Sequence, residues 1–255
     1  MSEDVGAPAV LMLAAGRGKR LGADAPERPK VLIPFGGRTL LERHLERLDR
    51  AGAGPVTLVV GYQAAQIAAE LDRLGRRDVR LLENPDWHEG SVVSLWRGLD
   101  VLEGGTPALL MDADVIYGQA LLDRLVRSRF AAALLLDREL EPGDEPVKIC
   151  VDDDGRMVDF AKRPEAAHAW HGESVGFFRF APAAATRLAA RVRALVEAGE
   201  RGIEYEEPIR SLIREDKAGM FGYEDITGLP WTEIDFVEDV RKAEALLPLL
   251  QEVSA

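Results

Sequence analysis

Short apolar runs alternate with amphipathic stretches through the first half of the chain. The runs are expected to form buried strands, and the stretches, whose apolar residues recur at helical spacing, are expected to form helices. This reasoning predicts strands at 10–15, 55–60, 79–83, 108–111 and 131–136, and helices at 39–51, 64–74, 91–102 with Ser91 as N-cap, and 119–127. Such alternation is typical of βαβ units and predicts a Rossmann-like α/β fold, with a mixed, mostly parallel sheet flanked by helices.

The second half has a different pattern. Strands predicted at 147–151 and 157–161 flank Asp152-Asp153-Asp154-Gly155-Arg156, a clear hairpin turn. A further strand is predicted at 176–180, and helices at 183–198, 205–215 and 237–250. Because no linker, repeat or low-complexity tract separates the halves, we expect residues 1–255 to form a single domain with a small β insertion.

The chain of 255 residues is long enough to bury a full α/β core. No apolar run approaches the about 20 residues that a membrane span needs, and Glu3 and Asp4 lie where a signal peptide would be basic, so we expect a cytoplasmic protein without a membrane partner. The one cysteine, Cys150, excludes an intramolecular disulfide and a Cys-based zinc site, and its alternating surroundings predict a buried, inert thiol. A net charge of −12 argues against nucleic-acid binding, so a nucleotide site would need cations concentrated at one pocket.

A glycine-containing loop after the first predicted strand supplies that concentration of cations. Its glycines let backbone N–H groups approach a polyanion closely, and Arg17, Lys19, Arg20 and Lys30 lie within a short stretch of sequence. The alternative is an ordinary turn with solvated arginines, since the pattern is neither a Walker loop nor a dinucleotide motif. The small residues before the glycines, the basic cluster and the later Pro-Lys pair together favour binding of a triphosphate.

Carboxylates gather at two further places. Asp112 and Asp114 follow a buried strand, at the edge where open parallel sheets bind ligands, and Glu233 and Asp235 precede the last predicted helix. Oxygen ligands beside phosphates suit Mg²⁺, which needs only one or two carboxylates. For each pair the alternative is capping of the turn or helix that follows.

The run Leu-Ala-Ala-Gly-x-Gly-x-Arg, the later Pro-Lys and the segment Trp231-Thr232-Glu233-Ile234-Asp235 together resemble a known superfamily. They are similar to nucleotidyltransferases that act on sugar phosphates and alcohol phosphates, closest to phosphocholine and 2-aminoethylphosphonate cytidylyltransferases. The resemblance covers nearly the whole chain, and it is strongest at the N-terminal loop and weakest in the acceptor region. It implies that residues 1–136 bind the NTP, that 137–236 bind the acceptor, and that 237–255 form a C-terminal helix.

The resemblance also implies roles for individual residues. Arg20 and Lys30 would be catalytic, holding phosphates and stabilising charge during attack on the α-phosphorus. Mg²⁺ would be bound by Asp114 and Asp235, with Glu233 and Asp112 as outer ligands, although the family pattern leaves the choice between Asp112 and Asp114 open. The expected nucleotide contacts are Leu13, Ala14, Ala15, Gly16, Arg17, Gly18, Lys19, Gly61, Gly90, Ser91, Ser94 and Asp112, and the expected acceptor contacts are Lys148, Lys162, Glu173, Tyr205 and Trp231.

The implied reaction transfers CMP from CTP to phosphocholine, 2-aminoethylphosphonate or a similar phosphate or phosphonate, or to a polyol phosphate, with release of pyrophosphate. The acceptor oxygen is already anionic, so no general base is needed, and none of His44, His88, His168 and His171 is expected to be catalytic. The alternatives are a sugar-1-phosphate nucleotidyltransferase using UTP, GTP or dTTP, a glycosyltransferase with Asp-x-Asp, and a non-catalytic sensor. The expected partners are CTP and the acceptor, without nucleic acid, in a monomer or homodimer.

Overall fold

The computed structural model describes residues 6–18, 28–140 and 145–251. The strands of its main sheet are β1 (Ala9–Ala14), β4 (Val56–Val60), β5 (Arg80–Glu83), β6 (Ala108–Asp112), β8 (Ala132–Asp137), β9 (Lys148–Val151), β10 (Met157–Ala161), β11 (Trp170–Phe180) and β12 (Phe221–Asp225). The helices are η2 (Lys30–Leu32), α1 (Leu40–Ala51), α2 (Ala64–Leu74), α3 (Ser91–Arg97), α4 (Leu99–Leu102), α5 (Gln119–Val126), α6 (Pro182–Glu197), α7 (Glu206–Glu215) and α8 (Val237–Gln251). Two small sheets pair β2 (Pro34–Phe35) with β3 (Arg38–Thr39), and β7 (Val115–Tyr117) with β13 (Trp231–Glu233).

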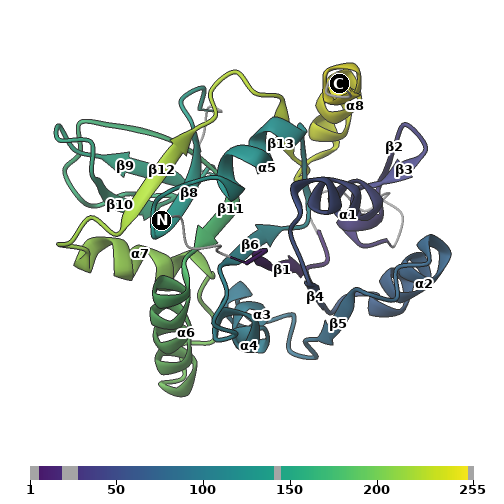
Figure 1. Ribbon diagram of the computed structural model, residues 1–255, viewed down its shortest axis with the longest axis horizontal. Coiled ribbons are helices and arrows are strands. Elements are labelled where there is room, and N and C mark those ends of the chain that lie inside the picture. Colours follow the sequence, from purple (N-terminus) through teal and green to yellow (C-terminus); the bar gives the residue numbers. More distant parts are fainter. Residues whose placement is uncertain (1–5, 19–27, 141–144, 252–255) are drawn as a thin grey trace.

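The main sheet runs in the order β10-β9-β11-β6-β1-β4-β5, with β8 and β12 continuing from β11 (Figure 1). Strands β6, β1, β4 and β5 are parallel, whereas β11 is antiparallel to β6, β8 and β9. Helices lie on both sides of the sheet. These observations confirm the predicted fold, a mostly parallel α/β sheet flanked by helices.

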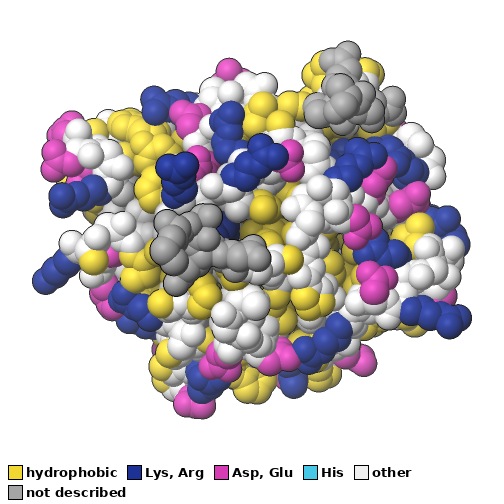
Figure 2. All heavy atoms as spheres, in the orientation of Figure 1, with side chains coloured by type: hydrophobic (Ala, Val, Ile, Leu, Met, Phe, Trp, Pro, Cys, Tyr) yellow, Lys and Arg dark blue, Asp and Glu magenta, His cyan; other side chains and the backbone are white. Residues whose placement is uncertain are grey.

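Alternate residues of the central strands supply two hydrophobic cores, because successive side chains of a strand point to opposite faces. In β1, Val10 and Met12 pack in the core that is covered by α1, α2, α5 and α8. Leu11, between them, packs in the opposite core with α3, α4, α6 and α7. On the face shown in Figure 2, Lys and Arg side chains are interspersed with Asp and Glu. Among the residues that the structure describes, none of the helices combines the length and apolar character needed to cross a membrane.

The position of the site follows from the strand order around β1. The chain passes from β1 to β4 on one side and later returns to β6 on the other side. The loops at the carboxyl ends of β1 and β6 therefore diverge, and this switch point is where open α/β sheets bind ligands. The glycine-containing loop follows β1, and the turn through Asp112 and Asp114 follows β6.

Two details of the predicted helix at 91–102 are wrong. The helix is interrupted at Gly98, whose Cα packs so closely on β1 that a Cβ there would lie 2.3 Å from Leu11 Cδ1. Its N-cap is Gly90, and Ser91 is the first helical residue. The Ser91 hydroxyl instead donates to Glu204 and accepts from the backbone N–H of Tyr205.

Other differences concern short or polar strands. The pairs β2–β3 and β7–β13, and the strand β12, were not expected, and β11 begins at Trp170 instead of residue 176. The hairpin of β9 and β10 around Gly155 is confirmed. Cys150 is buried, as predicted, and burial raises the pKa of its thiol to about 11.

A buried ion pair joins β10 to α7 and allows a stability prediction. Asp159 is fully buried, and its carboxylate accepts hydrogen bonds from Arg210 at 2.7 Å and from the N–H groups of Glu165 and Ala166 at 2.7 and 3.0 Å. Burial would raise the pKa of Asp159, but Arg210 and these N–H donors outweigh it and hold the pKa well below its usual value.

We expect Asp159→Asn to lower the free energy of unfolding by about 3 kcal/mol, because it removes the only fully buried charge that pairs with Arg210 among its described partners, and the other two, Glu165 and Glu207, are exposed. Urea unfolding at pH 7 measures this loss. Since the folded pKa lies below the unfolded value of about 4, the contribution is present above that pH and is lost as the pH falls. The difference in the free energy of unfolding between the wild type and Asp159→Asn should therefore shrink in acid. Asp154→Asn, in the exposed turn nearby, is the control, and equal effects of the two substitutions would contradict the prediction.

Candidate active site

The glycine-containing loop leads from β1 toward Lys30, the first residue of η2. Gly18 has a φ of 67°, and a Cβ at this position would lie 2.8 Å from Lys30 Cγ. Glycine therefore supplies both the left-handed backbone and the space through which the lysine side chain passes. Lys19 and Arg20, predicted to bind phosphates, lie outside the described residues.

Lys30 lies between two carboxylates that come from distant parts of the sequence. Its Nζ donates to Asp114 Oδ2 at 2.8 Å and to Asp235 Oδ1 at 2.5 Å, and its side chain is only 14% exposed. Burial would lower the pKa of Lys30, but the charges of Asp114 and Asp235 outweigh burial and raise it. The lysine is therefore fully cationic at neutral pH.

Asp114, Glu233 and Asp235 form a carboxylate triad, in which one oxygen of each residue lies within 4.8 Å of the others. The pairing of β7 with β13 brings them together, because Glu233 is opposite Val115 and the N–H of Ile234 donates to the Asp114 carbonyl at 2.8 Å. Partial withdrawal from bulk water, together with the charges of Asp114 and Asp235, raises the pKa of Glu233 to about 8.

The triad fits a magnesium ion. Its donors are all carboxylate oxygens, which Mg²⁺ prefers, and oxygens on one ion are separated by about 3 to 4 Å, so small side-chain rotations would bring the three into ligating range. The charges of Asp114 and Asp235 add to the effect of burial in raising the pKa of Glu233, and a divalent cation would offset the repulsion among the three carboxylates.

Asp112 has a different environment from Asp114. Its Oδ2 accepts a hydrogen bond from the hydroxyl of Tyr205 at 2.5 Å. It also lies against Gly176, where a Cβ would come within 2.1 Å of the same oxygen. Burial and the nearby carboxylate of Asp114 raise the pKa of Asp112. The geometry thus favours Asp114 over Asp112 as the direct metal ligand.

Four cavities meet at the triad. Their volumes are about 670, 310, 230 and 80 Å³. Asp114 lines the cavities of about 80 and 230 Å³, and Glu233 lines those of about 230 and 670 Å³. Asp235 lines the cavities of about 310 and 670 Å³. Ligands in these cavities would therefore have their reactive groups at the carboxylates and Lys30.

Most of the predicted nucleotide contacts line the three smaller cavities. The cavity of about 80 Å³ is lined by Leu13, Ala14, Gly16 and Gly18, that of about 310 Å³ by Arg17 and Gly18, and that of about 230 Å³ by Leu13, Ala15, Gly16, Ser91, Ser94 and Asp112. Gly61 and Gly90 lie elsewhere. The backbone at Gly61 packs against Trp87, and that at Gly90 packs against the backbone of Gly202 and Ile203.

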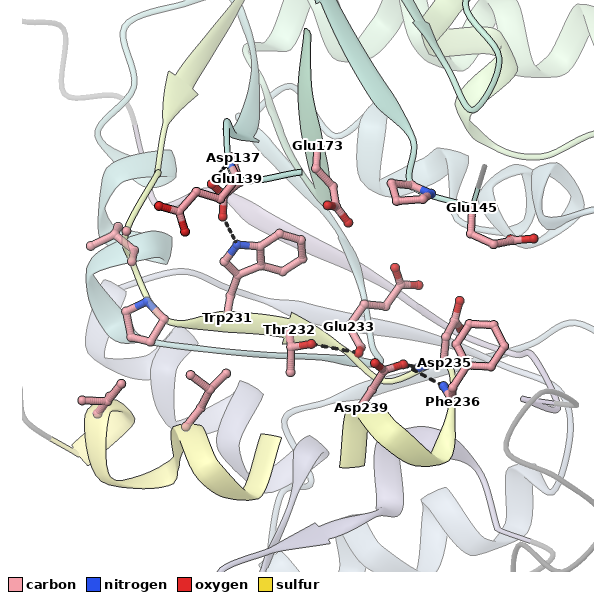
Figure 3. A pocket seen from close by; sticks show the side chains of 16 residues that line it. Asp137, Glu139, Glu145, Glu173, Trp231, Thr232, Glu233, Asp235, Phe236 and Asp239 are labelled. Carbon is pink, nitrogen blue, oxygen red and sulfur yellow. Dashed lines mark hydrogen bonds between the residues drawn. The ribbon is translucent and has the colours of Figure 1, made fainter. Parts of the chain in front are cut away.

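The largest cavity is acidic (Figure 3). All titratable side chains among its described lining residues are carboxylates, namely Asp137, Glu139, Glu145, Glu173, Glu233, Asp235 and Asp239. The indole of Trp231 stands among them, and its N–H donates to Asp137 at 2.7 Å. Glu173, on β11, is opposite Asp137 in the strand register, so the two side chains lie on the same face of the sheet.

The other predicted acceptor residues, Lys148, Lys162 and Tyr205, are not among the described residues that line this cavity. Lys162 forms an ion pair of 3.1 Å with Glu145, and Lys148 donates to the carbonyl of Lys162 at 2.9 Å, so both lysines contact its margin. Tyr205 lines the cavity of about 230 Å³, where its hydroxyl is bound to Asp112.

Sequence reasoning did not identify Asp137 or Glu139 as site residues. The sequence carries the same signal for Asp137 as for Asp112, because each is a carboxylate at the end of a buried, apolar strand. Tyr62 was also missed, although its ring lies beneath the Arg17 guanidinium, 5.4 Å away, and contacts Trp87.

Comparisons with known proteins identify the family of the chain. The sequence model of a family described as the MobA-like NTP transferase domain matches residues 10–217. The chain is 29% identical over 249 residues to a bifunctional IPC transferase and DIPP synthase from Rubrobacter xylanophilus, covering 96% of this chain and 52% of that protein. It is 26% identical over 207 residues to a 2-aminoethylphosphonate cytidylyltransferase from Lancefieldella rimae, covering 80% of each.

Among solved structures, a CTP:phosphocholine cytidylyltransferase from Streptococcus pneumoniae superposes with a TM-score of 0.73 at 23% identity, covering 94% of this chain and 99% of that one. At this identity the likeness establishes the fold. The chain spans about half or less of the length of several curated relatives that it matches.

Proposed function

Because the chain belongs to the family of MobA-like NTP transferase domains, we propose that it transfers CMP from CTP to a small phosphate or phosphonate that carries an ammonium group. Pyrophosphate is the second product, and Mg²⁺ is the cofactor. Phosphocholine and 2-aminoethylphosphonate represent the acceptor class. Membership of an NTP transferase family argues against the alternative of a glycosyltransferase.

The observation that carries this proposal is the acidic cavity beside the triad. A neutral sugar or polyol is recognised by a mixture of donors and acceptors, whereas the titratable groups described in this lining are all carboxylates. Carboxylates attract an ammonium group strongly in a partly water-excluded site, and an indole face such as that of Trp231 adds a cation–π attraction. The acceptor's phosphate end would lie where the cavity reaches Glu233 and Asp235.

The choice of CTP rests on the relatives. Two of the proteins described above are named for the transfer of a cytidylyl group, and their acceptors, phosphocholine and 2-aminoethylphosphonate, each carry an ammonium group. Other relatives are named glucose-1-phosphate adenylyltransferases, so a sugar-1-phosphate acceptor is the alternative that the experiment must exclude.

In the proposed reaction an acceptor oxygen forms a bond to the α-phosphorus of CTP, the bond to the bridging oxygen breaks, and its electron pair leaves with pyrophosphate. Mg²⁺, when bound, would neutralise phosphate charge and orient the triphosphate. Lys30 would move from its carboxylates to the phosphates and stabilise the charge that develops during attack. The acidic cavity would hold the acceptor by its ammonium end, which aligns the attacking oxygen.

Pyrophosphate release from CTP, UTP, GTP, ATP and dTTP, each paired with a panel of acceptors, tests the proposal. We expect CTP with 2-aminoethylphosphonate or phosphocholine to give a kcat/KM about 100-fold above that with propylphosphonate, which lacks the ammonium group; this ratio corresponds to about 3 kcal/mol. Faster turnover of glucose 1-phosphate than of any ammonium-bearing acceptor would instead support the sugar-1-phosphate alternative.

Glu173→Gln tests the acidic cavity itself. The side chain is 7% exposed and lines the cavity, so loss of its charge should lower kcat/KM for the ammonium-bearing acceptor by about 10- to 100-fold, chiefly through KM. The KM for CTP should change little. The control is Glu200→Gln, which makes the same change in net charge at an exposed position in the loop after α6. Equal effects of Glu173→Gln on acceptors with and without an ammonium group would contradict the assignment.

A further inference from the structure

His44 is a buried residue of α1 that contacts the turn between Asp112 and Asp114. Its side chain is 1% exposed and packs near Tyr117 and Phe177. Its Nε2 lies 3.1 Å from the carbonyl oxygen of Ala113, and its Nδ1 lies 3.3 Å from the hydroxyl of Tyr117.

The partners of the two ring nitrogens fix the tautomer. A carbonyl oxygen only accepts, so Nε2 carries the hydrogen and donates to Ala113, whereas Nδ1 accepts from the hydroxyl of Tyr117. Burial lowers the pKa of His44 to about 3, so the ring is neutral near pH 7 and adds no positive charge beside the metal site.

These two contacts lie at the ends of the short segment that carries Asp114. The segment begins at Ala113, whose N–H donates to the carbonyl of Leu13, and it ends at Tyr117 in β7. Since β7 pairs with β13, which carries Glu233, the two contacts of His44 lie beside the backbone segments that carry two members of the triad. The ring of Tyr117 is in turn fixed by Phe177, edge-on at 4.8 Å, and by the guanidinium of Arg47, 5.2 Å from the ring centroid.

We propose that His44 is a positioning residue for the metal site: by holding the Ala113 carbonyl and the Tyr117 hydroxyl, it sets the separation of the Asp114 and Glu233 carboxylates that bind the divalent cation. This inference rests on the metal site of the proposed function. Groups that orient metal ligands from behind commonly change metal affinity by about 10- to 100-fold when removed. A histidine that served packing alone would change only the stability of the fold.

Binding of Mn²⁺ to the whole chain separates a role in positioning the metal ligands from a role in packing alone. Electron paramagnetic resonance of the free ion measures this binding. His44→Leu, which keeps the apolar bulk and removes both contacts, should raise the Kd for Mn²⁺ about 10-fold, and the Mg²⁺ concentration for half-maximal turnover should rise in parallel. His44→Gln, whose amide can still donate to the Ala113 carbonyl, should recover most of the affinity. The control is Leu48→Ala, at a fully buried position of the same helix, which should lower the unfolding temperature without changing the Kd.

Wild-type Mn²⁺ affinity in His44→Leu, with a lowered unfolding temperature, would overturn the proposal. If His44→Leu does not fold, Tyr117→Phe provides the test, because it removes only the hydroxyl; an unchanged Kd in this variant also overturns the proposal. A wild-type protein that binds no Mn²⁺ refutes the metal site itself. A wild-type protein that binds Mn²⁺ without transferring CMP refutes the proposed reaction. The Mn²⁺ Kd of His44→Leu still tests the role of His44 in that case.

Discussion

Lys30→Ala is expected to reduce kcat/KM for CTP by about 10³-fold, the scale found when a preorganised charge-stabilising donor is removed. The structure places the ammonium within 2.8 Å of Asp114 and 2.5 Å of Asp235, at the meeting point of the site cavities. Pyrophosphate release measures the loss, and circular dichroism establishes whether the variant is folded.

Lys30→Arg is the matched control. It keeps the positive charge but replaces a compact ammonium with a larger, planar guanidinium whose donors have a fixed geometry. We therefore expect activity between those of the wild type and Lys30→Ala. Turnover of Lys30→Ala within a few-fold of the wild type would refute the role of the lysine in phosphate transfer.

The second large effect is expected for Asp235→Asn. The substitution keeps the shape of the side chain but removes one of the three negative charges that would bind Mg²⁺. It also removes the negative charge that forms an ion pair with Lys30. Turnover at saturating CTP should fall by about 10³-fold, and part of it should return at high Mn²⁺, which binds nitrogen and oxygen donors more tightly than Mg²⁺ does.

Glu238→Gln is the control for this change. Glu238 is exposed in the first turn of α8, three residues from Asp235, so its substitution also removes one negative charge from the neighbourhood without reaching the triad. We expect its turnover to stay within about two-fold of the wild type, because exposed charges are screened by salt. Similar losses in both variants would show that the effect is general electrostatics and not metal ligation.

The fold could be predicted well where long apolar runs form central strands. β1, β4, β6 and β8 were predicted to within one residue or so because each is buried on both faces. The short pairs β2–β3 and β7–β13 could not be predicted. Two or three residues carry no readable alternation, and the pairing of β7 with β13 depends on contacts between segments far apart in the chain.

The site could be predicted in part for a similar reason. Asp114 lies just past the end of β6, where topology alone places ligands, whereas Asp235 became a candidate only through the resemblance to nucleotidyltransferases. The choice between Asp112 and Asp114 depended on Tyr205 and Gly176, two partners that are distant in sequence. The roles assigned to individual site residues remain predictions until the variants described above are measured.

The stretch before α7 is attached to the start of α3 at several points. The N–H of Gly90 donates to the carbonyl of Arg201 at 2.9 Å, the N–H of Tyr205 donates to the Ser91 hydroxyl, and Arg201 forms ion pairs with Glu89 and Asp86. These hydrogen bonds and ion pairs thus connect α3, which is expected to contact the nucleoside, to the segment that carries Tyr205. Ser91, Ser94 and Tyr205 line the same cavity of about 230 Å³, so a ligand bound there should stiffen both segments together.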